Sequence, residues 1–403
     1  MGAVRAFRKS LLTAFSTPGF RFQWSADLLA AWAFEMETLI LGWYILVSTG
    51  SVFLLTVFGA LQFSGTLLAP WFGTLADRVS RRTLLLVLRG AFAGSALLLA
   101  ILDFGGWLGV WPVLAVALVG GLLRPADQVV RNALYADTVP AEQLSNAMGL
   151  ARTTMDSARI AGALAGAGVF SLLGFGAAYL VVTLFYAASV AFTRRIETGH
   201  PHPSGATAWR ELVVGARYIA DSTRMAVMMW LAFLVNVTAY PVTHGLMPYV
   251  AREVYGTDAN GLARLSAAFA AGALAGSLWF AAAARSAHGL RLVVAGIVAW
   301  YVLLAVFAYT PGLGSGMVVL ALTGAAQSLS MVSMMVVLLA QSAVEYRGRV
   351  MGVRMLAVYG LPLGLLAAGP VIDAIGFRAQ TTLFALIGLS LTLWTVWRWR
   401  RSL

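Results

Sequence analysis

Residues 73–102 have the sequence GTLADRVSRRTLLLVLRGAFAGSALLLAIL. Four of the first ten residues are charged, whereas the next twenty, Thr83 to Leu102, contain a single charge at Arg89. A helix of about twenty mostly apolar residues crosses the hydrocarbon core of a bilayer. This stretch therefore predicts a transmembrane helix that follows a charged loop.

The whole chain has the composition of an integral membrane protein. It has 403 residues, of which 60% are hydrophobic and 11% charged, and its mean hydropathy is +0.82. Soluble domains have apolar and charged shares of ~45–50% and ~25%. At roughly 33 residues for each helix and its connection, there is room for about twelve helices. Continuous apolar runs such as Leu290–Tyr309 exclude a membrane β-barrel, whose strands alternate apolar and polar residues.

We therefore expect an all-α membrane protein with 12 transmembrane helices in two six-helix bundles. The expected helices lie near residues 24–48, 52–75, 83–103, 108–130, 143–172 and 175–193, and then near 226–250, 262–284, 290–310, 315–341, 350–373 and 380–398. The expected domains are an interfacial N-terminal segment (1–19), an N-terminal bundle (20–193), a linker with an amphipathic helix at Trp209–Ala220 (194–225) and a C-terminal bundle (226–403).

The positions of the basic residues predict the topology. Nearly all basic loop residues lie at the two termini and in alternate connections, and the other connections contain only Arg252, Arg264 and Arg378. Cytoplasmic loops collect Arg and Lys. Both termini and the long middle linker are therefore expected in the cytoplasm.

Several chemistries are excluded by composition. The chain has no Cys, so it can form neither a disulfide nor a thiolate metal site. Its single lysine, Lys9, lies in the N-terminal tail, so no Gly-rich loop carries the lysine of a P-loop. The net charge of +12 is explained by topology, and no nucleic-acid partner is expected. His200 and His202 lie in a Pro-rich linker, and we expect no metal and no cofactor.

The charged loop at 73–82 resembles the signature loop of the major facilitator superfamily. That signature has Gly, three residues, Asp, Arg, then a Gly and two basic residues. The chain matches it at Gly73, Asp77, Arg78, Arg81 and Arg82, with Ser80 in place of the second Gly. The resemblance implies a transporter with alternating access, in which this loop is a conformational latch. Arg89 and Arg354 lie near the cytoplasmic ends of their helices and are the expected latch partners.

Two further stretches resemble the macrolide-efflux and enterobactin-exporter-like branch of that family. Residues 131–147 are similar to the region between helices 4 and 5, and residues 345–352 to the loop before helix 11. Many exporters have Gly-Pro in helix 5, where this chain has Gly162 and Ala163. The resemblance implies an exporter of the bacterial inner membrane that is coupled to protons.

Two acids in the first helix are candidates for proton coupling. An ionisable group at the bilayer centre costs about 2.5–3.5 kcal/mol and marks a functional site. Glu35 and Glu37 lie about ten residues inside the helix, and two positions on a helix differ by ~200°. The two carboxyls therefore cannot face one cavity. We favour Glu35 as the cavity acid because its face is smaller and more polar; a permanent ion pair with a membrane arginine is the alternative.

The fifth helix carries Arg152, Asp156 and Arg159 at i, i+4 and i+7, on one face. This spacing predicts a buried charge ladder, which could be purely structural. Asp156 is a third candidate for proton coupling. An arginine that is free of the ladder could bind an anionic substrate through two hydrogen bonds.

Polar residues in the second bundle are candidates for a substrate cavity. On helix 7 they recur at i, i+4 and i+8, and helices 10 and 11 add one each. The candidates are Asn236, Tyr240, His244, Gln327 and Tyr359.

Three functions remain open. We favour proton-coupled export of a small amphipathic organic compound by a monomer in contact with membrane lipid. The alternatives are a transporter of an organic anion, such as a siderophore or carboxylate metabolite, with its direction undecided, and a non-transporting receptor or scaffold. The sequence contains neither a His-carboxylate metal motif nor a nucleophile elbow, so an enzyme is not expected.

Overall fold

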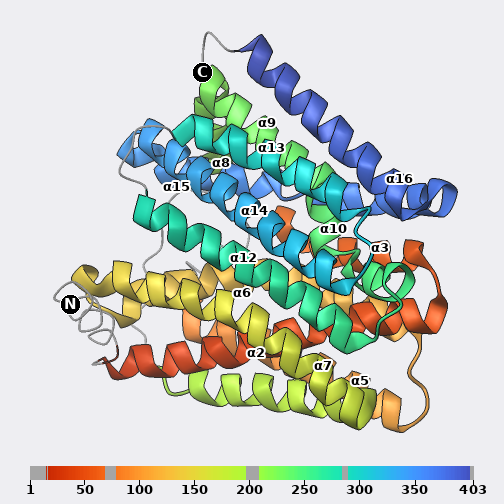
Figure 1. The fold of residues 1–403 in the computed structure, drawn as a ribbon. Coiled ribbons are helices and arrows are strands. Elements are labelled where there is room, and N and C mark those ends of the chain that lie inside the picture. Colours follow the sequence, from red (N-terminus) through yellow and green to blue (C-terminus); the bar gives the residue numbers. More distant parts are fainter. Residues whose placement is uncertain (1–14, 16, 69–78, 197–207, 284–288, 400–403) are drawn as a thin grey trace, which may run out of the picture. The chain divides into compact units, whose positions relative to one another are not determined.

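The computed structural model describes residues 15, 17–68, 79–196, 208–283 and 289–399, and every regular element within these ranges is a helix (Figure 1). Eight of the described helices are long and apolar enough to cross a membrane, or nine if a helix pair bent by 112° counts as one span. The chain is therefore a multi-pass membrane protein. Residues 1–14 of the N-terminal segment, residues 69–78 with the first part of the charged loop, and residues 197–207 of the linker lie outside the described residues.

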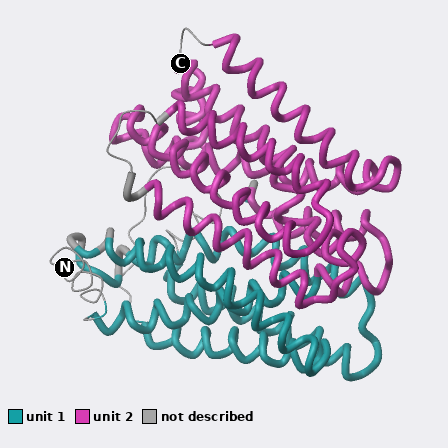
Figure 2. Tube along the Cα trace, in the orientation of Figure 1, with its two compact units in different colours: residues 1–41, 68–208 teal, residues 42–67, 209–403 magenta. Residues whose placement is uncertain are grey.

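The chain divides into two units, each with its own packing (Figure 2). Unit 1 comprises residues 1–41 and 68–208, and unit 2 comprises residues 42–67 and 209–403. The division falls inside α2 (Pro18–Thr49). The end of the first membrane helix and the helix after it are thus packed with the second half of the sequence.

Unit 1 is built from α2, α5 (Arg81–Phe104), α6 (Val110–Thr138) and α7 (Ala141–Thr193). With 53 residues, α7 would measure about 80 Å as one rod, far more than the ~30 Å of a bilayer core. Gly174 interrupts it with φ of 80°, a conformation that glycine adopts without steric cost. Just beyond this break, the Asp103 carboxylate accepts a hydrogen bond from the Gly176 amide (2.8 Å), which satisfies a free N–H at the start of the second segment.

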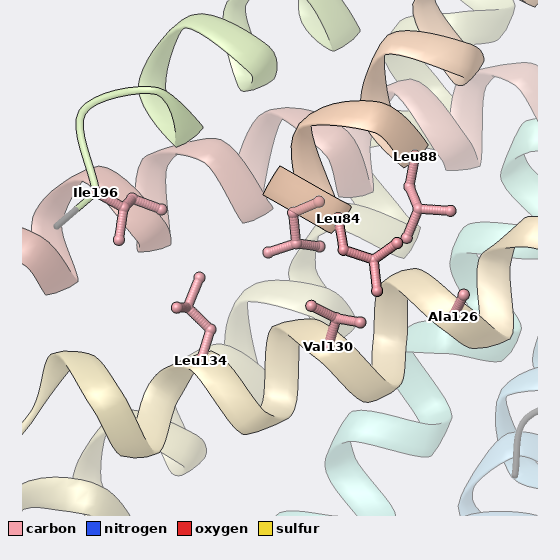
Figure 3. Packing of buried hydrophobic residues seen from close by; sticks show 7 residues of the cluster. Leu84, Leu88, Ala126, Val130, Leu134 and Ile196 are labelled. Atoms are coloured by element: carbon pink, nitrogen blue, oxygen red, sulfur yellow. The ribbon is translucent and has the colours of Figure 1, made fainter. Parts of the chain in front are cut away.

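One core cluster of unit 1 lies between the first half of α5 and the second half of α6. Figure 3 shows a cluster of Leu84, Leu85, Leu88, Ala126, Val130, Leu134 and Ile196. On another side, α7 approaches α2 closely at Gly166, where an added Cβ would lie 2.9 Å from the Cα of Met36. This close approach brings the middle of α7 next to the two acids of α2.

Unit 2 contains the remaining long helices. They are α9 (Thr223–Thr238), α12 (Ala259–Ala283), α13 (Gly289–Phe307), α14 (Leu313–Gln341) and α16 (Gly360–Arg398), with α3 (Val52–Leu61) and most of η2 (Ser64–Leu68) packed among them. As in α7, a glycine with positive φ, Gly376 (78°), interrupts α16. The backbones of α12 and α14 are in contact at Gly272 and Gly324, where any side chain would overlap a carbonyl oxygen of the other helix.

The prediction of one helix over 226–250 is wrong. In the structure α9 ends at Thr238 and is followed by α10 (Tyr240–His244), α11 (Met247–Tyr249) and the π-helical turn η3 (Val250–Val254). Pro241 and Pro248 have no amide hydrogen and cannot donate to the carbonyl four residues earlier. Gly245 between them disfavours a helix further. The helix is therefore interrupted twice.

The helix expected at 350–373 is also interrupted. The structure has η4 (Val344–Tyr346), α15 (Arg347–Ala357) and then α16 from Gly360. Pro362 removes the donor that would bond the Val358 carbonyl, which instead accepts from the Leu361 amide (2.9 Å). This break packs against α9, because an added Cβ at Gly364 would overlap the Val237 carbonyl oxygen.

Close contacts bind the segment 42–67 to the rest of unit 2. A guanidinium nitrogen of Arg252 donates to the Leu46 carbonyl (2.8 Å) near the end of α2. Ala60 packs in a cluster with Leu361 and Leu365. The Leu46 carbonyl also accepts from the Gly50 amide (2.9 Å), so Arg252 adds a second hydrogen bond that ties the end of α2 to η3. The Ala60 cluster holds α3 against α16.

Candidate functional site

Glu37 forms a short ion pair within the membrane helices of unit 1. Its Oε2 lies 2.8 Å from a guanidinium nitrogen of Arg124 on α6 and accepts a hydrogen bond from the Tyr186 hydroxyl on α7 (3.0 Å). The guanidinium also lies over the Phe34 ring, 3.4 Å from its centroid. The Glu37 side chain is 7% exposed. This carboxylate joins α2, α6 and α7.

Glu35 has a looser partner on a different helix. Its Oε1 lies 3.6 Å from Nε of Arg159 on α7, beyond the distance of a good hydrogen bond. The Arg159 side chain is 41% exposed. The Gly162 position next to them is tightly packed, since an added Cβ would lie 3.0 Å from the Cβ of Glu35. Glu35 is thus close to α7 but only weakly paired.

The different partners follow from helix geometry. Two positions along α2 turn the side chain by ~200°, so the acids face different neighbours. Asp156 does not join them: its carboxylate pairs with Arg152 one turn earlier (3.1 Å). Arg152 is 76% exposed, so the fully buried ladder expected at this face is absent at Arg152, and Arg159 pairs with the neighbouring helix instead.

A second charge network lies deeper in unit 1, around Arg89. This side chain is fully buried and pairs with Asp27 of α2 and with Asp127 of α6 (3.2 Å). It also donates to the Thr193 hydroxyl (2.8 Å). The Tyr135 hydroxyl donates to the other oxygen of Asp27 (2.5 Å). Four helices are therefore joined by one network of buried, charge-assisted hydrogen bonds.

This network is not evident as a site from the sequence alone. Arg89 was expected near the membrane surface as a latch partner, but it has no exposed surface. The available signals were Asp27 in an apolar helix and the i, i+4 pair of Asp127 and Arg131, whose charged groups lie 3.9 Å apart. Neither signal indicates which helices meet.

Three of the cavity candidates of unit 2, Asn236, Tyr240 and His244, lie on either side of the break between α9 and α10. Tyr240 makes an edge contact with the His244 ring (4.8 Å between centroids) and another with Trp300 of α13 (4.9 Å). Asn236 is buried, and its amide donates to a carbonyl of its own helix, Ala232 (2.8 Å). Gln327 is buried in α14, and Tyr359 lies at the break before α16.

The linker helix α8 (Ala208–Ala220) docks on the segment 343–352 within unit 2. Glu211 receives two hydrogen bonds from Arg349. The Tyr218 ring stacks on Tyr346 with centroids 4.2 Å apart, and its hydroxyl accepts from the Ala343 amide (3.1 Å). The segment that the sequence comparison singled out before helix 11 is therefore the binding surface of the linker helix.

No group of three or more His, Asp or Glu side chains that could hold a metal ion occurs in the part of the chain that the structure describes. A family model described as Major Facilitator Superfamily matches residues 24–362. The chain belongs to the major facilitator superfamily. The match extends from the first membrane helix to the first turn of α16.

Solved structures of major facilitator proteins share this fold. The crystal structure of the nucleoside transporter NupG superposes with a TM-score of 0.72 at 16% identity, and covers 94% of this chain and 98% of that chain. A single-residue variant of the E. coli fucose:proton symporter FucP gives 0.62 at 14% identity, with 93% and 97% covered. The human organic anion transporter MFSD10 gives 0.65 at 16%, with 94% and 99% covered. No curated protein sequence matches significantly. The family and these folds indicate a transporter and not an enzyme.

The superfamily signature loop is only partly described. Gly73, Asp77 and Arg78 lie outside the described residues. Arg81 donates to the Ala133 carbonyl of α6 (3.0 Å), and Arg82 donates to the Arg194 carbonyl after α7. Arg354 is half-buried in the last turn of α15. The two described loop arginines thus bond to backbone at the ends of neighbouring helices in unit 1.

Proposed function

We propose that the protein is a secondary active transporter that exports a small amphipathic organic compound in exchange for protons. The observation that carries this proposal is the pairing of two membrane acids on α2 with arginines of different helices, one tightly and one loosely. Charged groups at membrane depth are costly and mark ion or substrate paths. The fold supports a transporter, and the loose pair supplies a group that can change partner.

Glu35 is the proposed coupling group. Because its carboxylate lies 3.6 Å from the arginine nitrogen, and this arginine is 41% exposed, a proton can neutralise Glu35 without breaking a short hydrogen bond. Neutral Glu35 releases Arg159, and loss of the proton restores the pair. Glu37 holds α2 against α6 and α7 throughout, and Asp156 stays paired with Arg152.

The proposed architecture has twelve spans in two bundles, at 20–193 and 226–403, with both termini in the cytoplasm. Two of the eight membrane-length stretches, of 48 and 55 residues, are each long enough for two spans of ~20 residues. Their interruptions at Gly174 and Gly376 supply the turns. The short helix α3, continued by η2, and the broken helix from α9 to η3 supply the remaining two spans.

We further propose that the protein is a monomer in a bacterial inner membrane and a member of the macrolide-efflux and enterobactin-exporter-like branch. The support is the resemblance of residues 131–147 and 345–352 to that branch, together with the basic residues at the cytoplasmic ends.

A second candidate function is transport of an organic anion. The exposed guanidinium of Arg159 favours it, because its weak bond to Glu35 leaves donors for a carboxylate or similar group. In this case the substrate displaces Glu35, and Glu35 tunes affinity.

Transport by purified protein in liposomes separates these candidates. Vesicles with an imposed pH gradient are loaded with the amphipathic dye ethidium, and efflux is followed by fluorescence. In the proposed exporter Glu35→Gln abolishes the response to the gradient but preserves dye exchange without a gradient. Glu345→Gln, which changes an exposed acid of η4, is the control and retains both activities.

The outcome for Arg159→Gln decides between the two functions. The anion transporter is favoured if the unmodified protein does not transport the dye but binds carboxylate ligands, and if Arg159→Gln loses that binding. No transport of either class, with all variants equal to the unmodified protein, favours the scaffold and contradicts the proposal.

A further inference from the structure

A groove of about 670 Å³ lies between α13 and the second segment of α16 in unit 2. Its lining is almost entirely apolar and includes Tyr301, Val302, Ala305, Val306, Tyr309 and Leu386. None of these residues belongs to the candidate site. The groove is therefore a separate feature that the proposed transport chemistry does not explain.

The floor of the groove is a fixed aromatic ring. Tyr301 is buried, and its hydroxyl shares a hydrogen bond with Thr238 of α9 (2.6 Å). Opposite it, Gly388 leaves space for the ring, since an added Cβ would overlap it. A side chain at 388 would push the two helices apart, so the groove depends on this glycine.

The walls face outward and are apolar. Val302, Val306 and Leu386 are 47%, 49% and 54% exposed, and both helices belong to membrane-length stretches. Exposed apolar side chains on membrane helices face lipid, since hydrocarbon is the solvent there. The medium next to the groove is therefore the acyl region of the bilayer.

The length and the polar end of the groove fit one lipid leaflet. The helical part of the lining, Tyr301 to Phe307, rises about 9 Å and continues into the turn at Tyr309 and Thr310, so this wall fits within half of the ~30 Å hydrocarbon core. At this end the Thr382 and Tyr309 hydroxyl oxygens lie 3.3 Å apart, and Tyr309 is 60% exposed, as expected for a tyrosine at the headgroup level. The exposed Arg378 lies one turn before Thr382, and its carbonyl accepts the hydrogen of the Thr382 hydroxyl (2.8 Å).

We propose that this groove binds one acyl chain of an anionic phospholipid, with the glycerol region at Tyr309 and Thr382 and the phosphate near Arg378. The acyl chain fills the apolar groove. Among the described lining residues and the turn before Thr382, Arg378 supplies the only charge at the polar end of the groove. The proposal concerns lipid binding and does not rest on the proposed transport.

Native mass spectrometry of the full-length protein tests the proposal. Protein is reconstituted with palmitoyl-oleoyl phosphatidylglycerol, extracted in mild detergent and sprayed intact. Ala305→Phe and Val302→Phe place a ring in the groove, and each is expected to remove one retained lipid per chain. Ala295→Phe, on the exposed face of α13 but outside the lining, retains the lipid. Val302 is 47% exposed, so a ring at this position disturbs the packing little, and this second variant separates loss of the lipid from loss of folding.

The headgroup is tested separately with Arg378→Gln. This variant is expected to retain one lipid but to lose the preference for phosphatidylglycerol over phosphatidylcholine. Equal lipid counts in the unmodified protein and both filling variants would overturn the proposal. So would filling variants that retain the lipid but lose ethidium efflux, because the groove would then serve substrate and not lipid.

Discussion

The two ion pairs of α2 are expected to differ strongly in energy, although their acids are two residues apart. Glu37 and Arg124 lie 2.8 Å apart with side chains 7% and 20% exposed. Removing one partner of a buried pair leaves an uncompensated charge and costs about 3–5 kcal/mol. We therefore expect Glu37→Leu and Arg124→Leu each to lower the free energy of unfolding by that amount.

The double variant separates the pair from its surroundings. When both charges are replaced by leucine, no charge remains uncompensated, and replacing a buried pair by apolar residues is often close to neutral. The double variant is therefore expected to lose much less than the sum of the single losses, with a coupling energy of at least ~3 kcal/mol, the upper end of the values found for residues in contact. The contact of Arg124 with Phe34 is lost in both arginine variants and cancels in the cycle.

The same cycle on Glu35 and Arg159 is the internal comparison. The longer distance of 3.6 Å and the 41% exposed arginine weaken this pair, although Glu35 itself is only 15% exposed, so its coupling energy is expected to be smaller than that of Glu37 and Arg124. Equilibrium unfolding in mixed micelles, with denaturing detergent added in steps, gives the free energy of unfolding of all seven proteins. A coupling energy for Glu35 and Arg159 equal to or above that for Glu37 and Arg124 would refute the assignment of the loose pair.

Three further predictions concern unit 2. Either Glu211→Arg or Arg349→Glu alone is expected to weaken the docking of α8, and the double variant, which exchanges the two charges, is expected to restore it. Protease cleavage of the linker measures the docking. Equal cleavage of the single and double variants would show that the Glu211–Arg349 pair does not hold α8. Gly364→Ala, where an added Cβ overlaps a carbonyl of α9, is expected to lower stability by about 1–3 kcal/mol, whereas Gly348→Ala, with open space around it, changes it little; equal melting shifts would contradict this packing. Asp258 caps the start of α12, and the hydrogen bond that its carboxylate accepts from the Gly261 amide lowers the pKa of this carboxyl below its ordinary 3.8. The cap is therefore expected to contribute about 1 kcal/mol above pH 3.8 and to lose this contribution as the pH falls through the lowered pKa. If an Asp258→Ala variant loses the same stability at low pH as the unmodified protein, Asp258 is not the source of that loss.

Much of the fold could be predicted from the sequence because the signals are local. Apolar runs predict membrane helices wherever they are long enough, and α5, α12, α13 and α14 lie close to their expected ranges. The expected helices at 226–250 and 350–373 were wrong for an equally local reason. Pro241, Pro248 and Pro362 were visible in the sequence, but whether a proline bends or breaks a membrane helix depends on what packs against the freed carbonyl.

The partners within the site could not be predicted, because they depend on packing between helices far apart in sequence. Helix geometry did predict that Glu35 and Glu37 face different neighbours. It could not show that Arg124 pairs with one and Arg159 with the other, since each of the arginines on α6 and α7 was an equal candidate. Arg89 shows the same limit: its sequence position indicated the membrane surface, but the packing of α2, α6 and α7 around it gives it three buried partners.

The distribution of charge indicates where the chemistry of this transporter lies. In the described residues, every ion pair between different membrane-length helices, including those of Glu35, Glu37 and Arg89, lies in unit 1. Stability alone does not account for them, because apolar residues of similar volume would serve as well or better. Unit 2 instead has helices interrupted at Pro and Gly and backbones in direct contact. We therefore expect substitutions that abolish the proposed proton coupling to map to unit 1, and substitutions that alter stability and hinge geometry to map to the helix breaks of unit 2.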